Sequence, residues 1–180
     1  NDKMFINQAH YIKNLVEEYG LEDGKVTGTP MQSNIKLIKA TEEESKEFKG
    51  KGLDYRSAIG SLNYLSQCTR PDITYVVGKL SQFLENPNDS HWSAFKRVVR
   101  YLKGLQDYGI LYQPDSGHEI IGYVDSSWAE DEQSLSTSGY NFLCGSGIVS
   151  WRSKKLGGPS SSSTEAEYQA YLSASQEAQW

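Results

Sequence analysis

The sequence predicts an α+β protein in which a helical part comes first and a part built of strands, ending in a helix, follows it. The apolar residues recur with a helical period as far as Gly104, and with the period of two that is typical of strands after it. The charge changes at the same place: residues 1–104 hold 15 Lys or Arg against 13 Asp or Glu, and residues 105–180 hold 3 against 10. The two halves therefore differ in kind, and the length allows one domain or one small domain plus part of another. The charges exclude a uniformly basic nucleic-acid binder and leave open a basic element that feeds an acidic, metal-dependent site.

The first helix is predicted from Asn7 to Tyr19. Its apolar residues are spaced at i, i+3, i+4 and i+7 from Ile12, and Gly20 follows where a left-handed C-cap is expected. Residues 22–53 contain Thr29-Pro30, scattered glycines and a charged run. We therefore expect an extended connection there, which ends in a short helical or solvated stretch and adds little to the core.

Three more helices are predicted before residue 105. Asp54 can cap the first of them, and Asp72 can cap the second, which stops at Asn86-Pro87. The third begins after Asp89-Ser90 and ends at Gly104. Each has an apolar stripe with helical spacing, which predicts one buried face on each helix.

The last of these helices carries a row of cations beside its apolar stripe. The basic row consists of Lys96, Arg97, Arg100 and Lys103. Its members recur at single turns, so the phosphates of a nucleic acid could meet them in succession. A solvated helix face explains the same spacing, and nothing in the row specifies a base sequence.

After Gly104 the sequence predicts strands followed by a final helix. The predicted strands cover residues 109–113, 119–125, 139–144 and 147–152. Turn residues separate the first two strands, and Gly145-Ser-Gly147 joins the last two as a hairpin. A loop rich in Gly and Ser, from Gly157 to Ser163, leads into a helix from Thr164 to at least Gln179.

Two carboxylates in this second part could bind a divalent metal ion. Asp125 lies at the end of a predicted strand, and Glu167 lies in the first turn of the final helix. A structural role explains each of them as well: Asp125 as a turn residue at a strand end, and Glu167 as the acid of a capping box that begins at Thr164. Glu165 lies on a different face of the helix, and we expect it in solvent.

Many short motifs follow one another along the chain. They are Tyr55-Arg56, Ile59-Gly-Ser-Leu-Asn-Tyr-Leu65, Thr69-Arg-Pro-Asp-Ile73, His91, Lys96-Arg97, Arg100-Tyr-Leu-Lys-Gly104, Gly122-Tyr-Val-Asp125, Trp128-Ala129, Ser136-Thr-Ser-Gly-Tyr140, Ser150-Trp151, Ser153-Lys-Lys155 and Ser162-Ser-Thr-Glu-Ala-Glu-Tyr168. Singly these motifs are weak, but in this order and spacing they resemble the Pol polyprotein of copia-type LTR retrotransposons over most of the chain. The run Val26-Thr-Gly-Thr-Pro-Met31 also resembles that family's segment after the polymerase palm.

The resemblance implies that residues 1–115 correspond to the end of a reverse transcriptase, in its thumb or connection region. Residues 116–180 would then be the start of a ribonuclease H domain, an incomplete β-β-β-α unit. In enzymes of that fold, acidic residues bind two Mg²⁺ ions, or Mn²⁺ in their place, which activate a water and stabilise the leaving oxygen of an RNA phosphodiester. The resemblance assigns Asp125 and Glu167 to this catalytic and metal-binding set. It also implies an RNA–DNA hybrid and the remainder of the Pol polyprotein as partners.

The chain departs from the family pattern in ways that bear on activity. Ser127 stands where the family usually has a second aspartate, and the basic residues that often precede Ser136 are absent. In the family the polymerase carboxylates lie before the position of Asn1, and the third and fourth acidic residues of the ribonuclease H site lie after that of Trp180. We therefore expect no DNA synthesis and little nuclease activity from this chain alone.

Two other functions are compatible with the same residues. The helical part and its basic row could hold an RNA–DNA hybrid or a partner protein without cleavage, and the chain could also be a genomic relic without a selected function. No run of about 18 apolar residues occurs, so no membrane partner is expected. The resemblance implies a location in the cytoplasm, within a virus-like particle, or in the nucleus.

Overall fold

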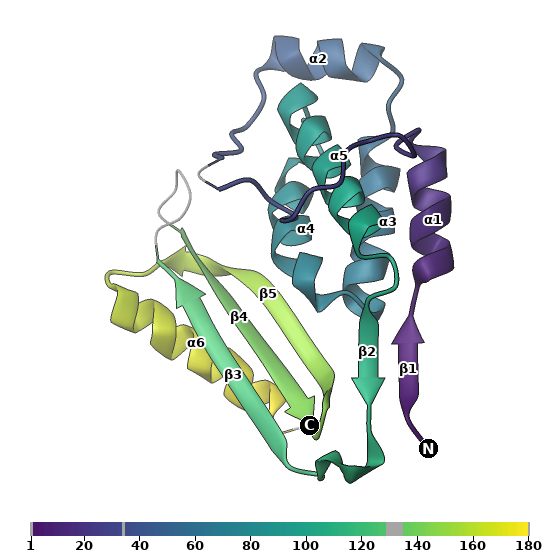
Figure 1. Cartoon of the computed structure of the whole chain (residues 1–180). Helices are drawn as coiled ribbons and strands as arrows, with labels where there is room; N and C mark the ends of the chain where they lie inside the picture. The colour runs from purple at the N-terminus through teal and green to yellow at the C-terminus, as the bar shows by residue number, and fades with distance from the viewer. Residues whose placement is uncertain (1, 34, 129–134, 180) are drawn as a thin grey trace. The chain divides into compact units, whose positions relative to one another are not determined.

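The structure, a computed structural model, describes residues 2–33, 35–128 and 135–179. The chain divides into two compact units: a helical unit of residues 7–109, and a sheet unit of residues 1–6 and 110–180. Figure 1 shows the helices of the first and the three-stranded sheet of the second. The α+β class predicted from the sequence is confirmed.

The helical unit consists of α-helices joined by loops and short turns of 3-10 helix. In chain order its elements are α1 (Ala9–Glu18), α2 (Glu42–Gly50), α3 (Tyr55–Cys68), η1 (Pro71–Ile73), α4 (Thr74–Leu80), η2 (Ser81–Phe83) and α5 (Asp89–Gly104). Gly20 follows α1 with a φ of 60°, as predicted, because glycine has no Cβ to clash in the left-handed region. Asp54 caps α3 as predicted: its Oδ1 accepts a hydrogen bond of 3.0 Å from the N–H of Ser57.

Two predicted helix starts are corrected. Asp72 does not cap a helix, because it lies inside η1, and α4 begins at Thr74 without a side-chain cap. The helix α5 begins two residues earlier than predicted, at Asp89, because Asn88 caps it. Its side-chain oxygen accepts hydrogen bonds from the backbone N–H groups of Ser90 and His91.

One apolar core holds the helical unit together. Fully buried side chains such as Ile12, Leu62 and Phe95 bring α1, α3, α4 and α5 into a single cluster. Phe48 of α2 joins that cluster and is only 1% exposed. The prediction that residues 22–53 add little to the core is therefore wrong at Phe48.

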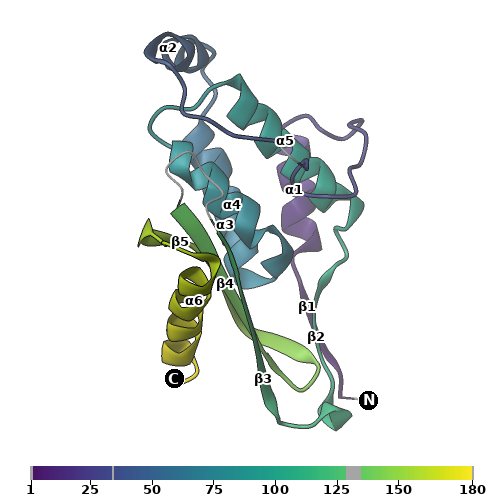
Figure 2. The ribbon, with the colours of Figure 1, turned by 90° about the vertical axis from the view of Figure 1, so that its left-hand side faces the viewer.

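The sheet unit contains two separate groups of strands and one helix. Its elements are β1 (Met4–Asn7), β2 (Gly109–Tyr112), η3 (Pro114–Ser116), β3 (Ile120–Ser127), β4 (Leu135–Cys144), β5 (Gly147–Pro159) and α6 (Ser163–Glu177). The strands β1 and β2 pair with each other, and β3, β4 and β5 form an antiparallel sheet in that order. The helix α6 packs against β3 and β4 and covers one face of this sheet (Figure 2).

The hairpin of β4 and β5 is longer than predicted. Gly145, with a φ of 58°, turns the chain, and the pairing continues as far as Leu135 opposite Pro159. The residues from Gly157 to Pro159 were predicted as loop, but β5 is an edge strand, where glycine and proline are tolerated. The strand β1 was not predicted at all.

A narrow stripe of alanines attaches α6 to the sheet. Ala166, Ala170 and Ala174 are its buried residues, and their four-residue spacing places them on one side of the helix. Large side chains of α6, such as Tyr168, are exposed. No helix in the described ranges is both long enough and apolar enough to cross a membrane.

Candidate functional site

Asp125 lies within β3, paired with Gly139 of β4. It is not a turn residue at a strand end, because β3 continues to Ser127. Side chains alternate across a strand, so Asp125 points away from the face on which Tyr140, opposite Val124, donates a hydrogen bond to α6. Asp125 is therefore exposed on the face of the sheet that α6 leaves uncovered.

Glu167 lies in the first turns of α6 and takes no part in capping the helix. The N-cap is Ser162, whose Oγ accepts a hydrogen bond of 3.2 Å from the N–H of Glu165. Thr164 is already inside the helix, so the capping box expected between Thr164 and Glu167 does not form. The Glu167 side chain is exposed.

Glu165 binds the residue before the N-cap of α6 and forms no capping box. Its Oε2 accepts hydrogen bonds from the N–H and the Oγ of Ser161, at 2.7 and 2.5 Å. These bonds from Ser161 hold the pKa of the Glu165 carboxyl below its usual range. The expectation that Glu165 is simply solvated is therefore wrong, because its carboxylate is bonded at the helix start.

The two candidate metal ligands come from neighbouring elements, since α6 packs against β3. Among the residues that the structure describes, no group of three or more His, Cys, Asp or Glu side chains could hold a metal ion. Mg²⁺ prefers roughly six oxygen ligands in a regular octahedron. Asp125 and Glu167 do not complete such a site: they are only two ligands, and Asp125 lies on the face of the sheet that α6 leaves uncovered, whereas Glu167 belongs to α6.

The basic row lies on α5, and all four of its side chains are half-buried. The segment after α1 crosses this helix (Figure 1) and contacts Arg97, Arg100 and Lys103. The Nζ of Lys103 donates hydrogen bonds to the backbone oxygens of Glu22 and Gly24. The Nη2 of Arg97 donates a hydrogen bond of 2.9 Å to Thr29 Oγ1.

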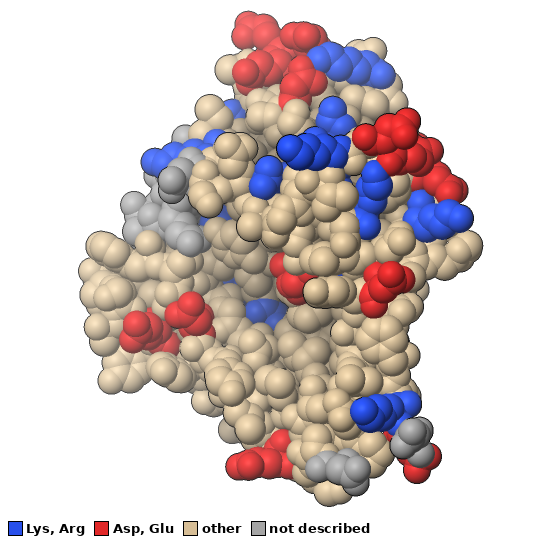
Figure 3. Space-filling model, in the orientation of Figure 1, with Lys and Arg blue, Asp and Glu red and all other residues tan. Residues whose placement is uncertain are grey.

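The crossing segment lies very close to α5. A Cβ on Gly104 would come within 2.2 Å of a methyl group of Val26, and the stem of Arg100 lies against Gly24. Figure 3 shows Lys and Arg side chains among uncharged ones over this region of the helical unit. A solvated helix face is therefore the wrong description of the basic row, which holds a long connection in place through two of its members.

A buried ion pair near the end of α5 was not anticipated. Arg70 is 1% exposed, and its Nε and Nη2 donate to the two carboxylate oxygens of Asp72 at 2.9 and 2.7 Å. Its Nη1 donates to the backbone oxygen of Leu105 at 2.9 Å, and Tyr101 Oη donates to Asp72 at 2.8 Å. The short spacing of Arg70 and Asp72 in the sequence could have indicated the ion pair. Their other partners, Leu105 and Tyr101, are about thirty residues away in the sequence.

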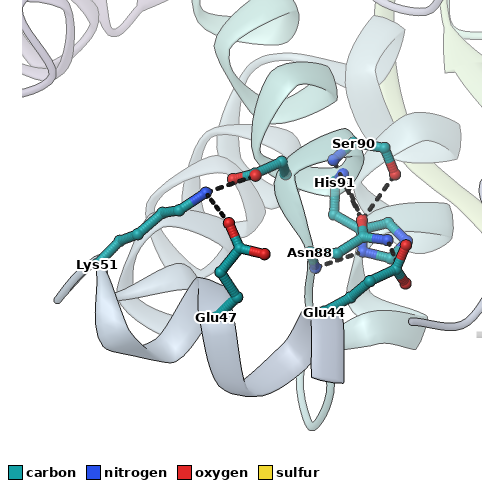
Figure 4. Close-up of polar contacts among 7 residues, drawn as sticks. Glu44, Glu47, Lys51, Asn88, Ser90 and His91 are labelled. Atoms are coloured by element: carbon teal, nitrogen blue, oxygen red, sulfur yellow. Dashed lines mark hydrogen bonds and ion pairs between the residues drawn. The ribbon is translucent and has the colours of Figure 1, made fainter. Parts of the chain in front are cut away.

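A second polar network joins α2 to the start of α5 (Figure 4). The Glu44 carboxylate accepts from the N–H of Thr41, completing a capping box, and from the side chain of Asn88. The backbone N–H of Asn88 donates to Nδ1 of His91 at 3.0 Å. His91 is fully buried and stacks on Phe83 with ring centres 4.0 Å apart. Burial lowers the pKa of His91, so its neutral form is favoured.

Known proteins similar to this chain include retrotransposon polyproteins. It is 38% identical over 178 residues to the retrovirus-related Pol polyprotein from transposon RE2 of Arabidopsis thaliana, which covers 98% of this chain and 12% of the polyprotein. It is 37% identical over 181 residues to that from transposon TNT 1-94 of Nicotiana tabacum, covering 99% of this chain and 14% of the polyprotein.

A shorter relative is matched over most of its length. The secreted RxLR effector protein 161 of Plasmopara viticola is 48% identical over 131 residues, which are 72% of this chain and 92% of the effector. No family model and no solved structure matches the chain. The chain therefore belongs to the family of sequences homologous to copia-type retrotransposon Pol polyproteins, and it spans 12% to 14% of the length of the two polyproteins named above.

Proposed function

We propose that this chain is the part of a retrotransposon Pol polyprotein that joins the end of the reverse transcriptase to the start of its ribonuclease H domain, and that it holds an RNA–DNA hybrid. In this proposal residues 1–115 are the thumb or connection region, and residues 116–180 begin the nuclease domain. The supporting observation is the order of elements in the sheet unit: three antiparallel strands and then a helix. Asp125 lies in the first of these strands, and Glu167 lies in the helix.

The parent enzyme would copy RNA into DNA and hydrolyse the RNA of the resulting hybrid with two magnesium ions. Asp125 and Glu167 would contribute two carboxylates to that chemistry. They offer too few oxygen ligands for two magnesium ions, so we expect this chain to bind the hybrid without cleaving it. On this proposal it acts in the cytoplasm, in a virus-like particle, or in the nucleus.

The basic row on α5 is the proposed contact with the phosphates of the hybrid. Lys96 and Arg100 are half-buried and lie one turn apart. Arg97 and Lys103 already bind the crossing segment, so we expect them to contribute by holding that segment against the helix. The remainder of the polyprotein is the proposed protein partner.

Cleavage is tested with an RNA–DNA hybrid labelled on the RNA strand, in Mg²⁺ or Mn²⁺. The chain, Asp125→Asn and Glu167→Gln are compared. We expect no metal-dependent cleavage from any of the three. Cleavage by the chain that either substitution abolishes would overturn the expectation of inactivity and assign both carboxylates to a working site.

Binding is tested by fluorescence anisotropy with the same hybrid over a range of salt concentrations. We expect Lys96→Gln with Arg100→Gln to weaken binding and to reduce the slope of log K against log salt by about 0.7–0.9 for each phosphate that the variant no longer neutralises. The charge-matched control is Lys13→Gln with Lys46→Gln, because both lysines are exposed on other helices. A chain that does not bind the hybrid at low salt contradicts the proposed function.

A further inference from the structure

The sheet unit contains a cleft that the proposed function does not use. It has a volume of about 340 Å³ and lies between the strands β4 and β5 and the C-terminal half of α6. Arg152 and Lys154 line it from β5, Ser138 and Tyr140 line it from β4, and Glu177 lines it from α6. Its volume is within the range of sites for small ligands, about 300–1,000 Å³.

The positive charge of the second part of the chain is concentrated at this cleft. Residues 105–180 contain three Lys or Arg, against ten Asp or Glu. All three, Arg152, Lys154 and Lys155, line the cleft. In an otherwise acidic unit, such a concentration creates one local site where an anion is favoured.

The register of the hairpin brings hydroxyl groups to the same place. Tyr140 is paired with Arg152, and Ser138 is paired with Lys154. Directly opposite residues of an antiparallel pair share a face of the sheet, so each cation has a hydroxyl beside it. Arg152 and Lys154 are both exposed and can therefore reach a ligand from solvent.

Glu177 forms the acidic wall of the cleft and is held by two hydroxyl groups. Ser150 Oγ donates to one carboxylate oxygen at 2.6 Å, and Tyr140 Oη donates to the other at 3.1 Å. Burial and Glu177 raise the pKa of Tyr140 although the neighbouring Arg152 lowers it, so the phenol stays protonated as a donor. The carboxylate opposes an incoming anion, which makes Glu177 a sensitive position for a test.

We propose that this cleft binds a phosphate group through Arg152 and Lys154, while the Ser138 and Tyr140 hydroxyls beside them donate to the Lys154 backbone oxygen and to Glu177. The planar guanidinium can grip two phosphate oxygens while the ammonium acts as a point charge. The phosphate comes from a nucleic-acid strand or from a free phosphomonoester. The first source rests on the proposed function. With a nucleic-acid strand as the source, the cleft would be a second contact with the hybrid, in a different unit from the basic row.

The test uses the full chain and the variant Arg152→Gln with Lys154→Gln, with the labelled hybrid as the probe. We expect hybrid affinity to fall about tenfold or more and the salt slope to fall by about 1.4–1.8, for two phosphate contacts. The control Lys13→Gln with Lys46→Gln, which changes the net charge equally, should leave the slope unchanged. Both cleft residues are exposed, so circular dichroism should be unaltered.

Glu177→Gln tests the opposite change, because it removes the repelling charge; its amide oxygen can accept from one of the two hydroxyls, and its NH2 group can donate to the oxygen of the other. We expect it to tighten hybrid binding several-fold. If Arg152→Gln with Lys154→Gln and Glu177→Gln all bind the hybrid as the unchanged chain does, the cleft does not contact the hybrid, while the proposed function stands.

Inorganic phosphate tests the cleft without the hybrid. It therefore separates the cleft proposal from the proposed function if the chain does not bind the hybrid. It is titrated at constant ionic strength and followed by NMR shifts of the cleft residues. Saturable shifts that Arg152→Gln with Lys154→Gln removes would support a phosphomonoester site without the hybrid. Shifts that are absent from the chain, or unchanged in the variant, would then overturn the cleft as a phosphate site.

Discussion

The helical unit and the sheet unit are stabilised in different ways. In the helical unit, buried aliphatic and aromatic side chains from five helices form one cluster, and charged residues such as Arg70 are buried only with partners. In the described part of the sheet unit, the buried residues are mostly small: three alanines of α6 and a run of hydroxyl residues from Ser136 to Ser138. A deep core supports the first unit, whereas backbone pairing and a thin layer of contacts support the second.

This difference bears on function because surface left unburied is available for binding. The sheet unit exposes Ile121 and Tyr123 on β3 and presents its cations in an open cleft. In the helical unit, the cations of α5 are partly engaged by the chain itself. The same residue types therefore stabilise one unit and can contact a ligand on the other.

The largest expected effect compares two phenylalanines. Phe95 is fully buried and its ring contacts those of Tyr19 and Trp92, so Phe95→Ala should cost about 3–5 kcal/mol, because a cavity is left in a rigid core. Phe142 lies over Gly122 in the thin layer of the sheet unit, and Phe142→Ala should cost about 1.5–3 kcal/mol, close to the transfer term alone. Urea unfolding followed by hydrogen exchange assigns each loss to its unit. Equal losses would contradict the proposed difference in depth.

The next effect concerns the buried ion pair. Arg70→Met should destabilise the helical unit by about 2–3 kcal/mol, because Asp72 and the Leu105 carbonyl lose their hydrogen-bond donor and the Tyr101 ring loses the cation above it. The value lies below that of fully buried pairs because the Asp72 side chain is 34% exposed.

Two variants serve as controls for this pair. Arg70→Lys keeps the charge and loses the fork, so it should recover only part of the stability. Lys51→Gln breaks an exposed pair with Asp89, and chemical denaturation should detect no change in the free energy of unfolding. If Lys51→Gln lost as much stability as Arg70→Met, burial would not explain why the Arg70 pair stabilises the protein.

The helical unit should also lose stability at acid pH through His91. Burial lowers the pKa of His91 in the folded state, so the unfolded chain takes up the proton first. Stability is fully present above the unfolded pKa of about 6.5 and falls as the pH drops below it, with a slope of at most about 1.4 kcal/mol per pH unit. Protonation also removes the Nδ1 acceptor for Asn88.

His91→Gln should flatten this pH dependence, because glutamine at the same position can complete a capping box and does not titrate. Denaturation of both proteins at several pH values between about 5 and 8, the range in which histidine titrates, measures this change in slope. An unchanged slope in the variant would assign the pH dependence to another group, such as the nearby Glu44.

The smallest effect tests the start of α6. Ser162→Ala should cost about 1 kcal/mol, because Ser162 Oγ caps the helix, whereas Thr164→Ala inside the helix should change stability by less than about 0.5 kcal/mol. Thermal unfolding of the sheet unit measures both. The reverse order would return Glu167 to a capping role and remove it from the proposed carboxylate pair.

The sequence alone determined the features that depend on neighbouring residues. The end of α1 at Gly20, the cap of α3 at Asp54 and the hairpin at Gly145 follow from backbone freedom and from hydrogen bonds within a few residues. The ordered motifs likewise predicted the family that the comparisons then supported. Such signals are local, so they can be read before the chain is folded.

Only the tertiary structure decided which partners distant residues have. Arg70 could not be placed without Leu105, nor Arg97 without Thr29, and the three cations of the sheet unit meet in one cleft only because β5 pairs with β4 beside α6. The extension of β5 through Pro159 also depends on its partner strand. Cross-strand pairing, helix packing and burial arise between residues tens of positions apart. Local composition therefore does not indicate which distant residues come into contact.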